Sequence, residues 1–348
     1  MLYSSSVIHG NTTSSADAAH HQAESRFSPS WRAAILCGMT DHSKQSPAPA
    51  MRWLDAAATA QALPWAALLD ELAAVCREHR AGKIHCPPRM VLPLPGDATL
   101  LVMPAISADI SITKLVTVHP HNSERGLPTI AGEVVVLDSV TGARLALLDG
   151  PTLTARRTAA VSFLALRYLA LQAPREVLIV GGGAQALAHG QALRALYPDA
   201  RLWLQGHRQA PGFAAELQAE LLAFEDQASR RWDLVIAATT SRVPVLQAGV
   251  GAGALVLGVG AYRHDMVELP PELVRSAQVF VDDAEGAQAE AGDLLAAGLT
   301  EAQPSLEDLV LGQGALTDGR TRVFKSVGCA RWDLAAARLA ARGALGSA

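Results

Sequence analysis

The pattern of apolar residues changes along the chain. From Met51 to about residue 150, short apolar segments follow one another with short turns between them, after one longer segment. In that longer segment, Leu63–Arg80, apolar residues recur at Leu68, Leu72 and Val75, which predicts an amphipathic helix. Strands are expected at Met90–Leu94, Thr99–Met103, Ile110–Val118, Gly132–Asp138 and Arg144–Leu148. The short turns favour antiparallel pairing, so this part of the chain predicts a mainly β module with a leading helix.

Beyond residue 150, helices and strands alternate. Thr154 is expected to cap a long helix, Ala155–Leu171. The elements expected after it are strand Val177–Val180, helix Ala184–Leu196, strand Arg201–Leu204, helix Phe213–Phe224, strands Leu234–Ala237 and Leu255–Gly258, helix Pro271–Ser276 and strand Val279–Val281. Such alternation is typical of a doubly wound parallel sheet. A last helix, Ala330–Ala341, is expected to pack back on the first module.

These patterns predict an α/β fold with two modules. A Rossmann-type doubly wound parallel sheet is expected over residues 173–311, and a smaller α+β domain over residues 51–172. Residues 312–348 are expected to pack back on the smaller domain. Residues 1–50 are polar, rich in turn-forming residues and without a sustained period. They predict a disordered extension, or sequence upstream of a true start at Met39 or Met51.

Composition narrows the classes of function. The 348 residues are 50% hydrophobic and 18% charged, which is enough apolar material for a large core. A net charge of −4 gives no electrostatic reason to expect binding to nucleic acid or to an anionic membrane. No apolar run in the sequence reaches the ~20 residues that span a bilayer. The four cysteines are widely spaced, which favours free thiols in a reducing cytoplasm over disulfides or a metal site.

An apolar strand runs directly into three glycines. Gly181, Gly183 and Ala186 match the G-x-G-x-x-G/A turn of dinucleotide-binding folds, with a strand before the turn and an unbroken helix after it. Glycine suits this turn because a Cβ atom would hold the backbone away from a pyrophosphate, whose charge sits at the helix N-terminus. The motif therefore predicts a nicotinamide or flavin dinucleotide. A tight strand–helix turn without a ligand is the alternative.

The end of the second strand bears on the type of nicotinamide cofactor. NAD-binding folds usually carry an Asp or Glu there, which binds the free ribose. Here the strand ends in Gln205, Gly206, His207 and Arg208, with no carboxylate. Arg208 together with His207 can pair with a 2′-phosphate, because the planar arginine fork binds phosphate in a bidentate manner. NADPH is therefore expected as the preferred cofactor, with NADH possible. A solvent-facing loop is the alternative role of these two side chains.

Several cations stand at positions where cations are unexpected. Arg156 and Arg157 are expected in the first helical turn after Thr154, where the helix dipole disfavours positive charge by about 0.3–1 kcal/mol each. A bound anion would offset that cost, so Arg157 above all is a candidate for holding a carboxylate; otherwise both point into solvent. Lys114 lies inside an apolar strand, where a lysine needs a partner unless its face is solvated. Arg89, just before a strand, is a weaker candidate.

Taken together, these motifs resemble one known family. The segments that match it are Met103–Ala105, Lys114, Asn122–Pro128, Leu153–Thr154, Arg157–Ala160, Gly181–Ala186, Ala238–Ser241, Gly292–Asp293 and Lys325–Gly328. They resemble the ornithine cyclodeaminase/mu-crystallin family over about residues 51–345, and the combination is far more specific than the glycine turn alone. Within that family, the run from His119 to Pro128 and the doubled Arg156–Arg157 look most like reductases of Δ1-pyrroline-2-carboxylate and Δ1-piperideine-2-carboxylate.

The resemblance implies a homodimer, with a Rossmann domain and a substrate domain whose sheet forms the dimer interface. It also implies that Arg89, Lys114 and Arg157 hold the carboxylate and the imine or amine of a small cyclic imino acid. Lys114 is the candidate for donating the proton. The residues implied for the cofactor site are Thr158, Gly181, Gly183, Ala184, Gln185, Ala186, His207, Arg208, Thr239, Gly260, Ser326 and Gly328.

The expected activity is the NAD(P)H-dependent reduction of cyclic ketimine carboxylates to L-proline and L-pipecolate. Cyclodeaminase relatives carry an Asp shortly after the glycine that matches Gly260; Tyr262 stands at that position here, which favours a reductase. Asp265, three residues on, is the alternative acid. An ornithine cyclodeaminase, a non-catalytic NADPH-binding protein and a reductase of open-chain imines stay as alternatives. The sequence leaves ring size open, because one methylene changes affinity by only ~1–3 kcal/mol in an apolar pocket.

Overall fold

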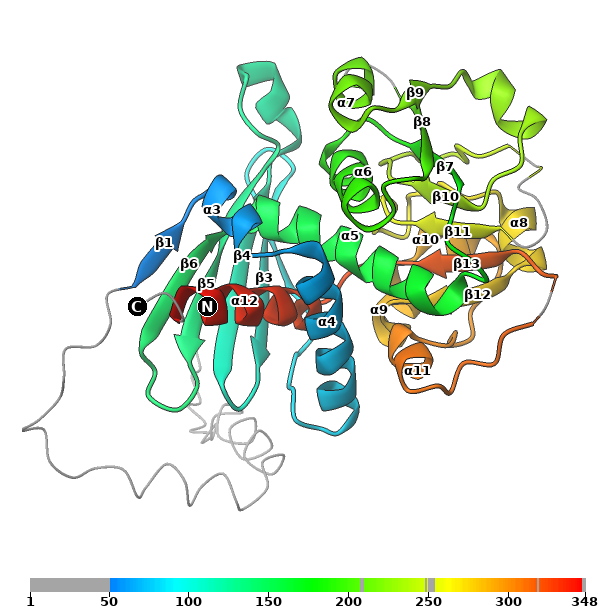
Figure 1. Cartoon of the computed structure of the whole chain (residues 1–348). Helices are drawn as coiled ribbons and strands as arrows, with labels where there is room; N and C mark the ends of the chain where they lie inside the picture. Colours follow the sequence, from blue (N-terminus) through cyan, green and yellow to red (C-terminus); the bar gives the residue numbers. More distant parts are fainter. Residues whose placement is uncertain (1–50, 207–209, 248, 250–253, 318, 346–348) are drawn as a thin grey trace, which may run out of the picture. The chain divides into compact units, whose positions relative to one another are not determined.

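The computed structural model describes residues 51–206, 210–247, 249, 254–317 and 319–345. In this part of the chain two β-sheets carry the fold, one mixed and six-stranded, the other parallel and seven-stranded (Figure 1). The predicted α/β class, with a Rossmann-type sheet and a second α+β module, is confirmed. The extension predicted at residues 1–50 lies outside the described residues. Within the described residues, no helix combines the length and apolarity needed to cross a membrane.

The six-stranded sheet has the order β1-β6-β5-β4-β3-β2. Its strands are β1 (Arg52–Leu54), β2 (Met90–Leu94), β3 (Ala98–Ile106), β4 (Ile110–Val118), β5 (Ile130–Asp138) and β6 (Arg144–Asp149). Neighbouring strands are antiparallel, as the short turns predict, except that β1 runs parallel to β6. Along β4 the alternate residues Ile112, Lys114 and Val116 are buried, so the face that carries Lys114 is the covered face of the sheet.

Two helices cover this inner face, and a third helix packs against both of them. Helices α5 (Gly150–Leu169) and α12 (Ala330–Leu345) contact strands of the sheet, and α4 (Trp65–Arg80) packs against both helices (Figure 1). The helix predicted over Leu63–Arg80 begins at Trp65, because Pro64 is its N-cap. A short helix, α3 (Ala56–Gln61), precedes it.

Helix α5 begins earlier than predicted. Its N-cap is Asp149, whose side chain accepts a hydrogen bond from the backbone N–H of Thr152 at 2.8 Å. Pro151 fits the first turn because the N–H that it lacks would have no partner inside the helix. Thr154 is therefore not the cap, and the expectation that two arginines occupy the first turn is wrong. Because α5 contacts strands of both sheets, its side chains reach the region between them.

The seven-stranded sheet has the order β12-β13-β11-β10-β7-β8-β9, with every pair parallel. Its strands are β7 (Glu176–Val180), β8 (Arg201–Gln205), β9 (Glu220–Leu221), β10 (Leu234–Ala237), β11 (Leu255–Gly258), β12 (Gln278–Val281) and β13 (Arg322–Lys325). The remaining helices are α6 (Ala184–Leu196), α7 (Ala210–Leu217), α8 (Pro271–Ser276), α9 (Ala284–Glu290), α10 (Gly292–Ala296) and α11 (Leu306–Val310), with 3₁₀ helices η1 (Pro120–Arg125) and η2 (Phe224–Ser229). The strand order reverses between β7 and β10, which is where such sheets bind ligands.

Two segments of the parallel sheet differ from expectation. The helix predicted over Phe213–Phe224 ends at Leu217, because Gln218 takes a positive φ of 50° and the chain then forms β9. Strand β13 has no counterpart in the prediction. It lies in the segment 312–348, and it pairs between β11 and β12 in the parallel sheet.

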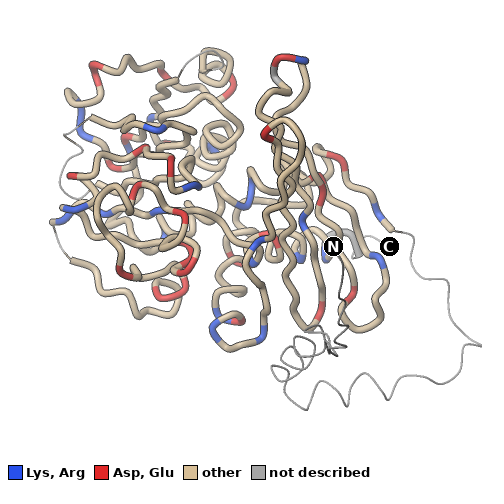
Figure 2. Tube along the Cα trace, turned by 180° about the vertical axis from the view of Figure 1, so that it is seen from behind, with Lys and Arg blue, Asp and Glu red and all other residues tan. Residues whose placement is uncertain are grey.

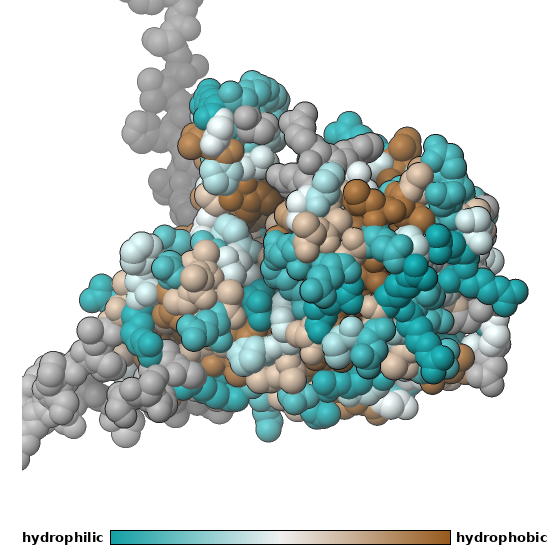
Figure 3. All heavy atoms as spheres, turned by 45° about the horizontal axis from the view of Figure 1, so that its top comes forward, coloured by the Kyte–Doolittle hydropathy of each residue, from teal (hydrophilic) through white to brown (hydrophobic). Residues whose placement is uncertain are grey.

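The buried apolar side chains form two clusters, and the surface is mixed in charge and polarity. One cluster of buried apolar side chains runs from one face of the parallel sheet through α4, α5 and α12 to the inner face of the six-stranded sheet, and a second fills the other face of the parallel sheet. Charged residues of both signs are scattered over the trace (Figure 2). The face in Figure 3 shows apolar patches among hydrophilic residues.

Candidate active site

Three buried charged side chains meet where β4, α5 and α12 come together. The Oδ2 atom of Asp333, on α12, lies 2.8 Å from Nζ of Lys114, and its Oδ1 atom lies 2.9 Å from Nε of Arg157. The exposed side-chain fractions are 3% for Lys114, 6% for Arg157 and 0% for Asp333. Nζ of Lys114 also lies 3.4 Å from Oγ1 of Thr154. One carboxylate therefore orders two of the cations predicted to hold substrate. We call Lys114, Asp333 and Arg157 the buried ionic cluster.

Burial sets the proton affinity of Lys114. Removing the ammonium group from water lowers its pKa, the cations Arg157 and Arg89 lower it further, and Asp333 opposes them. The result is a pKa of about 8, against an ordinary value of 10.5. Lys114 is thus mostly charged at neutral pH, yet it gives up its proton more readily than an ordinary lysine. A proton donor needs this property.

Arg156 does not join the buried ionic cluster. Its Nε and Nη2 atoms donate to the carbonyl oxygen of Leu63 at 3.1 and 2.7 Å, and its guanidinium lies 4.0 Å from the ring centre of Trp65. Arg156 therefore ties α5 to the start of α4. Both expectations for this side chain, a carboxylate ligand and a solvent-facing cation, are wrong.

Arg89 approaches the cluster from the segment before β2. Its Nη2 atom donates to Oε2 of Glu290 at 2.7 Å and to the carbonyl oxygen of Gly328 at 3.0 Å. Its charge is close enough to lower the pKa of Lys114. Arg89 and the two cations of the cluster bring three positive charges, and Asp333 and Glu290 bring two negative ones. These five side chains together therefore carry one net positive charge.

The segment Ser326–Gly328 connects the cluster to the edge of the parallel sheet. It follows β13 and is held by the buried carboxylate of Asp282, which accepts hydrogen bonds from Oγ of Ser326 at 2.8 Å and from the backbone N–H of Gly328 at 2.8 Å. Gly328 has a φ of +80°, and a Cβ atom there would lie 3.0 Å from Nη1 of Arg157. Glycine is thus required at Gly328 both by the backbone and by the arginine packed against it.

The glycine turn fits a dinucleotide. Gly181 has a φ of +149°, and a Cβ atom on it would come within 2.5 Å of the carbonyl oxygen of Ala238. Gly183 is the N-cap of α6, and the place of its missing Cβ is open, with no atom of the described residues within 4 Å. Ala186 is buried behind the turn. Open space beside a bare helix N-terminus suits a pyrophosphate, so these residues would hold that part of the cofactor.

The other residues predicted for the cofactor lie at the same end of the sheet or beside it. Ala184 and Gln185 begin α6, Thr158 follows Arg157 on α5, Thr239 and Gly260 follow β10 and β11, and Ser326 and Gly328 follow β13. The Oε1 atom of Gln185 is buried without a hydrogen-bond partner among the described residues, and it can accept a hydrogen bond from a ligand. The carboxyl ends of parallel strands are the usual place for a ligand in such sheets. Direct contact of these residues with a cofactor stays a prediction.

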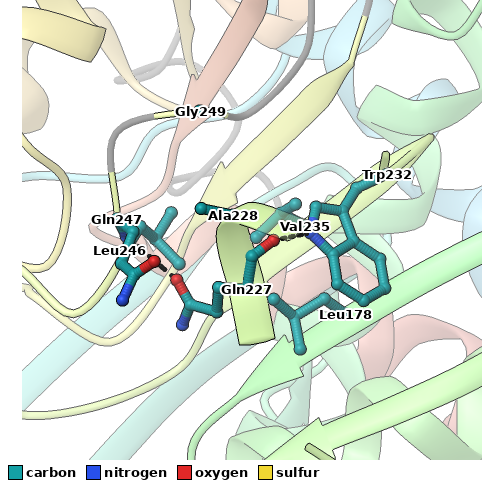
Figure 4. Close-up of a pocket in the computed structure, with 8 residues that line it drawn as sticks. All are labelled: Leu178, Gln227, Ala228, Trp232, Val235, Leu246, Gln247 and Gly249. Atoms are coloured by element: carbon teal, nitrogen blue, oxygen red, sulfur yellow. Dashed lines mark hydrogen bonds between the residues drawn. The ribbon is translucent and has the colours of Figure 1, made fainter. Parts of the chain in front are cut away.

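Gln205 stands where many NAD-binding folds carry an acid. Its Oε1 atom accepts a hydrogen bond from Nε2 of Gln227 at 2.6 Å. Gln227 is itself fixed in a small hollow, because its side-chain oxygen accepts from the backbone N–H of Gln247 and its carbonyl oxygen accepts from the indole N–H of Trp232 (Figure 4). An uncharged, immobilised amide therefore replaces the usual carboxylate. His207 and Arg208, the predicted partners of a 2′-phosphate, lie outside the described residues.

The alternative acid for deaminase chemistry is engaged elsewhere. The Oδ2 atom of Asp265 lies 3.1 Å from Nη2 of Arg242, and its Oδ1 atom lies 3.0 Å from Nε of Arg263. Both arginines are exposed. This pairing argues against Asp265 as the replacement for the acid that is missing at Tyr262.

Sequence reasoning missed the acids of the site. Asp333 holds the two cations of the cluster. Glu290 holds Arg89, and Asp282 holds the segment after β13. A signal for Asp333 was present, because its helical neighbours at i−3 and i+4, Ala330 and Ala337, are apolar and place the acid on the buried side of the helix. Which cations it would meet cannot be derived from that pattern.

Comparison with known proteins places the chain among enzymes of one family. The model of the ornithine cyclodeaminase/mu-crystallin family matches residues 53–347. Delta(1)-pyrroline-2-carboxylate reductase 1 of Burkholderia multivorans is 44% identical over 293 residues, which are 82% of this chain and 94% of that protein. The Delta(1)-pyrroline-2-carboxylate/Delta(1)-piperideine-2-carboxylate reductase of Azospirillum brasilense is 43% identical with the same coverage of both chains.

Solved structures with the same fold carry ligands. The Delta(1)-pyrroline-2-carboxylate reductase of Thermococcus litoralis, in complex with NADH and L-proline, matches with a TM-score of 0.77 and 28% identity, over 85% of this chain and 98% of its own. An archaeal alanine dehydrogenase dimer with bound NAD matches with a TM-score of 0.77 and 26% identity, over 85% and 97%. The family match covers the glycine turn, the buried ionic cluster and Arg89 alike. The chain therefore belongs to the ornithine cyclodeaminase/mu-crystallin family.

Proposed function

We propose that this protein is an NAD(P)H-dependent imine reductase that converts Δ1-pyrroline-2-carboxylate and Δ1-piperideine-2-carboxylate to L-proline and L-pipecolate. Relatives at 43–44% identity over most of the chain are reductases of these compounds. The observation that carries the proposal is the buried ionic cluster. Together with the Arg89–Glu290 ion pair it offers one net positive charge and a lysine of lowered pKa, which suit a carboxylate next to a basic nitrogen.

Arg157 and Arg89 bind the substrate carboxylate in this proposal. Asp333 engages Nε of Arg157 and Glu290 engages Nη2 of Arg89, so each guanidinium is held by an acid at one nitrogen and presents others to the ligand. The planar fork of arginine matches a carboxylate, and fixing it beforehand reduces the entropy lost on binding. The two arginines therefore orient the ring of the imino acid.

Lys114 supplies the proton. Its Nζ atom is held at 2.8 Å from Asp333, and its lowered pKa allows it to protonate the imine nitrogen, or to hydrogen-bond to it, so that the imine carbon becomes a better hydride acceptor. A reduced nicotinamide cofactor, when bound, would supply the hydride. Asp333 keeps both cations in place. The protein thus contributes orientation, charge complementarity and one proton.

NADPH is the preferred cofactor in this proposal, with NADH accepted. The support is the uncharged Gln205 at the end of β8, since a carboxylate there would repel a 2′-phosphate. We also place the enzyme in the reducing cytoplasm, because Cys76, Cys86 and Cys329 are free thiols in the structure.

A homodimer is also part of the proposal. The face of the six-stranded sheet that α5 and α12 leave uncovered carries apolar side chains, with exposed fractions of 72% for Trp53, 54% for Met90 and 40% for Leu115. Exposed apolar patches of this kind mark interfaces. A structurally similar alanine dehydrogenase is a dimer.

A direct assay tests the proposed activity. NADPH oxidation is followed with each of the two cyclic imines, and NADH is run in parallel; the wild-type protein is expected to oxidise at least one cofactor rapidly. Arg157→Ala removes a charged hydrogen bond worth about 1.5–3 kcal/mol, so kcat/KM is expected to fall about ten- to a hundredfold. Arg167→Ala, at an exposed position on the same helix, is the control and is expected to keep full activity.

Three results would contradict the proposal. Full catalytic efficiency in Arg157→Ala would show that the buried ionic cluster is not the substrate site. Ammonia release from L-ornithine without added reductant, together with no imine reduction, would instead identify a cyclodeaminase. Cofactor binding without either reaction would identify a non-catalytic binding protein.

A further inference from the structure

A buried glutamate joins two loops at the carboxyl end of the parallel sheet. Glu268 lies between β11 and α8, and its side chain is fully buried. Its Oε1 atom accepts a hydrogen bond from the backbone N–H of Thr239 at 2.5 Å and from Oγ1 of Thr239 at 2.9 Å. Its Oε2 atom accepts a hydrogen bond from the backbone N–H of Ala261 at 2.7 Å. One carboxylate thus fixes the residues that follow β10 and those that follow β11.

Glu268 is itself held from behind. Its backbone N–H and that of Leu269 donate to Oδ1 of Asp293 at 2.6 and 2.9 Å. Nζ of Lys325 lies 2.8 Å from Oδ2 of Asp293 and 4.0 Å from Oε2 of Glu268, and all three charged side chains are fully buried. Burial raises the pKa of Glu268, while Lys325 and the two backbone donors oppose that effect. Hydrogen bonds and the ion pair with Lys325 thus hold Glu268 and Asp293 together in the interior.

The geometry demands two acceptor oxygens. The N–H groups of Thr239 and Ala261 approach different oxygens of Glu268, so a glutamine would turn its own N–H₂ group toward one of them. The two loops also touch, because a Cβ atom on Gly260 would lie 1.9 Å from the carbonyl oxygen of Thr239. A small displacement of either loop would therefore disturb the other.

We propose that Glu268 is a positioning residue that shapes the pocket for the nicotinamide half of the cofactor; the inference rests on the proposed function. In a doubly wound sheet the dinucleotide lies across the point where the strand order reverses, here between β7 and β10. The adenosine end lies on the side of β8, and the nicotinamide end lies on the side of β10 and β11. Glu268 braces only the loops of the second side.

Binding measurements separate this role from a general effect on the fold. The affinities of NADPH and of 2′,5′-ADP, which lacks the nicotinamide half, are measured by calorimetry on the full chain without imine. In Glu268→Gln the dissociation constant of NADPH is expected to rise about ten- to a hundredfold, as the loss of one buried charged hydrogen bond implies. The dissociation constant of 2′,5′-ADP is expected to change less than about twofold, which is within the variation typical of substitutions at distant sites. Glu272→Gln, at an exposed position nearby, is the control and should change neither affinity.

The outcomes are distinct. Equal weakening of both ligands, or no weakening of NADPH, overturns the proposal. If Glu268→Gln does not fold, Glu268→Asp, which keeps both oxygens on a shorter stem, is judged by the same ratio of affinities. A wild-type protein that binds NADPH but reduces no imine would refute the proposed function and leave this test valid. A wild-type protein that binds no dinucleotide would overturn both.

Discussion

At the scale of single residues, Asp333 supports both cations of the buried ionic cluster. Its two carboxylate oxygens lie 2.8 and 2.9 Å from Lys114 and Arg157, and none of the three side chains has more than marginal access to water. Asp333→Asn keeps the shape and removes the charge, which leaves two buried cations without their acid. Breaking a buried ion pair in this way costs about 3–5 kcal/mol. We therefore expect a lower melting temperature and at least a tenfold loss of kcat/KM for the imine.

Calorimetry and steady-state kinetics check this prediction. Asp70→Asn is the matched control, because Asp70 is 71% exposed and its ion pair with Arg167 lies at the surface. The control is expected to keep both its melting temperature and its activity. Wild-type kinetics in Asp333→Asn would mean that Lys114 and Arg157 do not need the acid.

The pH dependence of the reaction reports on Lys114. A proton donor must be protonated in the free enzyme, so kcat/KM is expected to decline as the pH rises through the lysine pKa of about 8. An ordinary lysine would give that decline only near 10.5. Lys114→Arg provides the comparison, since a guanidinium stays charged over this range and should lose the decline together with most of the activity. An unchanged decline in Lys114→Arg would assign it to another group, such as the imine itself.

Residues of the site differ in how far the sequence reveals them. Lys114 and Arg157 could be predicted because a lysine in an apolar strand and an arginine near a helix start are out of place. The burial of Asp333 could be inferred from its apolar helical neighbours, but its partners could not, because Arg157 is 176 residues away in the chain and an acid in the first turn of a helix is ordinary. The structure brings the two predicted cations together at Asp333, but their contact with substrate stays a prediction. The dipole argument for Arg157 was wrong, because the helix begins at Gly150.

At the scale of elements, the segment after β13 connects the parallel sheet to Arg157 and Arg89. Gly328 there has a φ of +80° and leaves only 3.0 Å between its missing Cβ and Arg157. Gly328→Ala is therefore expected to strain the backbone by about 1 kcal/mol and to displace the arginine. We expect a rise in KM for the imine of tenfold or more, measured by steady-state kinetics.

A second glycine separates strain from displacement. Gly312 has nearly the same φ, +71°, but a Cβ atom there would meet no atom of the described residues within 4 Å. Gly312→Ala should therefore lower stability by about 1 kcal/mol, as the backbone strain requires, and leave KM unchanged. Equal effects of the two substitutions on KM would show that contact with Arg157 is unimportant.

Long elements with a clear apolar period could be predicted from the sequence, and short elements without one could not. Strand β4 and helix α6 have the bounds that their apolar patterns predict. Strand β13 could not be predicted, because it is four residues long and its end residues, Arg322 and Lys325, are charged yet buried. Arg322 donates to the carbonyl oxygen of Leu169 at 2.7 Å, and Lys325 pairs with Asp293. Tertiary partners, which a local pattern does not contain, make the strand possible.

At the scale of the whole described chain, the alternation of strands and helices correctly predicts the class of fold. It does not predict that β13 enters the parallel sheet between β11 and β12, or that α5 contacts both sheets. These two features bring the buried ionic cluster close to the edge of the parallel sheet where the cofactor is predicted to bind. They depend on contacts between distant segments, which single-sequence periodicity does not encode.

The uncovered face of the six-stranded sheet gives a prediction for the assembled molecule. Its exposed apolar side chains include Trp53, Met90 and Leu115, and burying apolar surface against a second copy is favourable by about 25 cal/mol per Å². Light scattering should therefore give about twice the chain mass of 36.5 kDa.

Leu115→Arg places a charge where it would be desolvated on association, and it should shift the mass toward that of one chain. Val140→Arg, at an exposed turn between β5 and β6, should leave the mass unchanged, because its charge stays in water. A wild-type mass of one chain, or a dimer that withstands Leu115→Arg, would locate the interface elsewhere or exclude it.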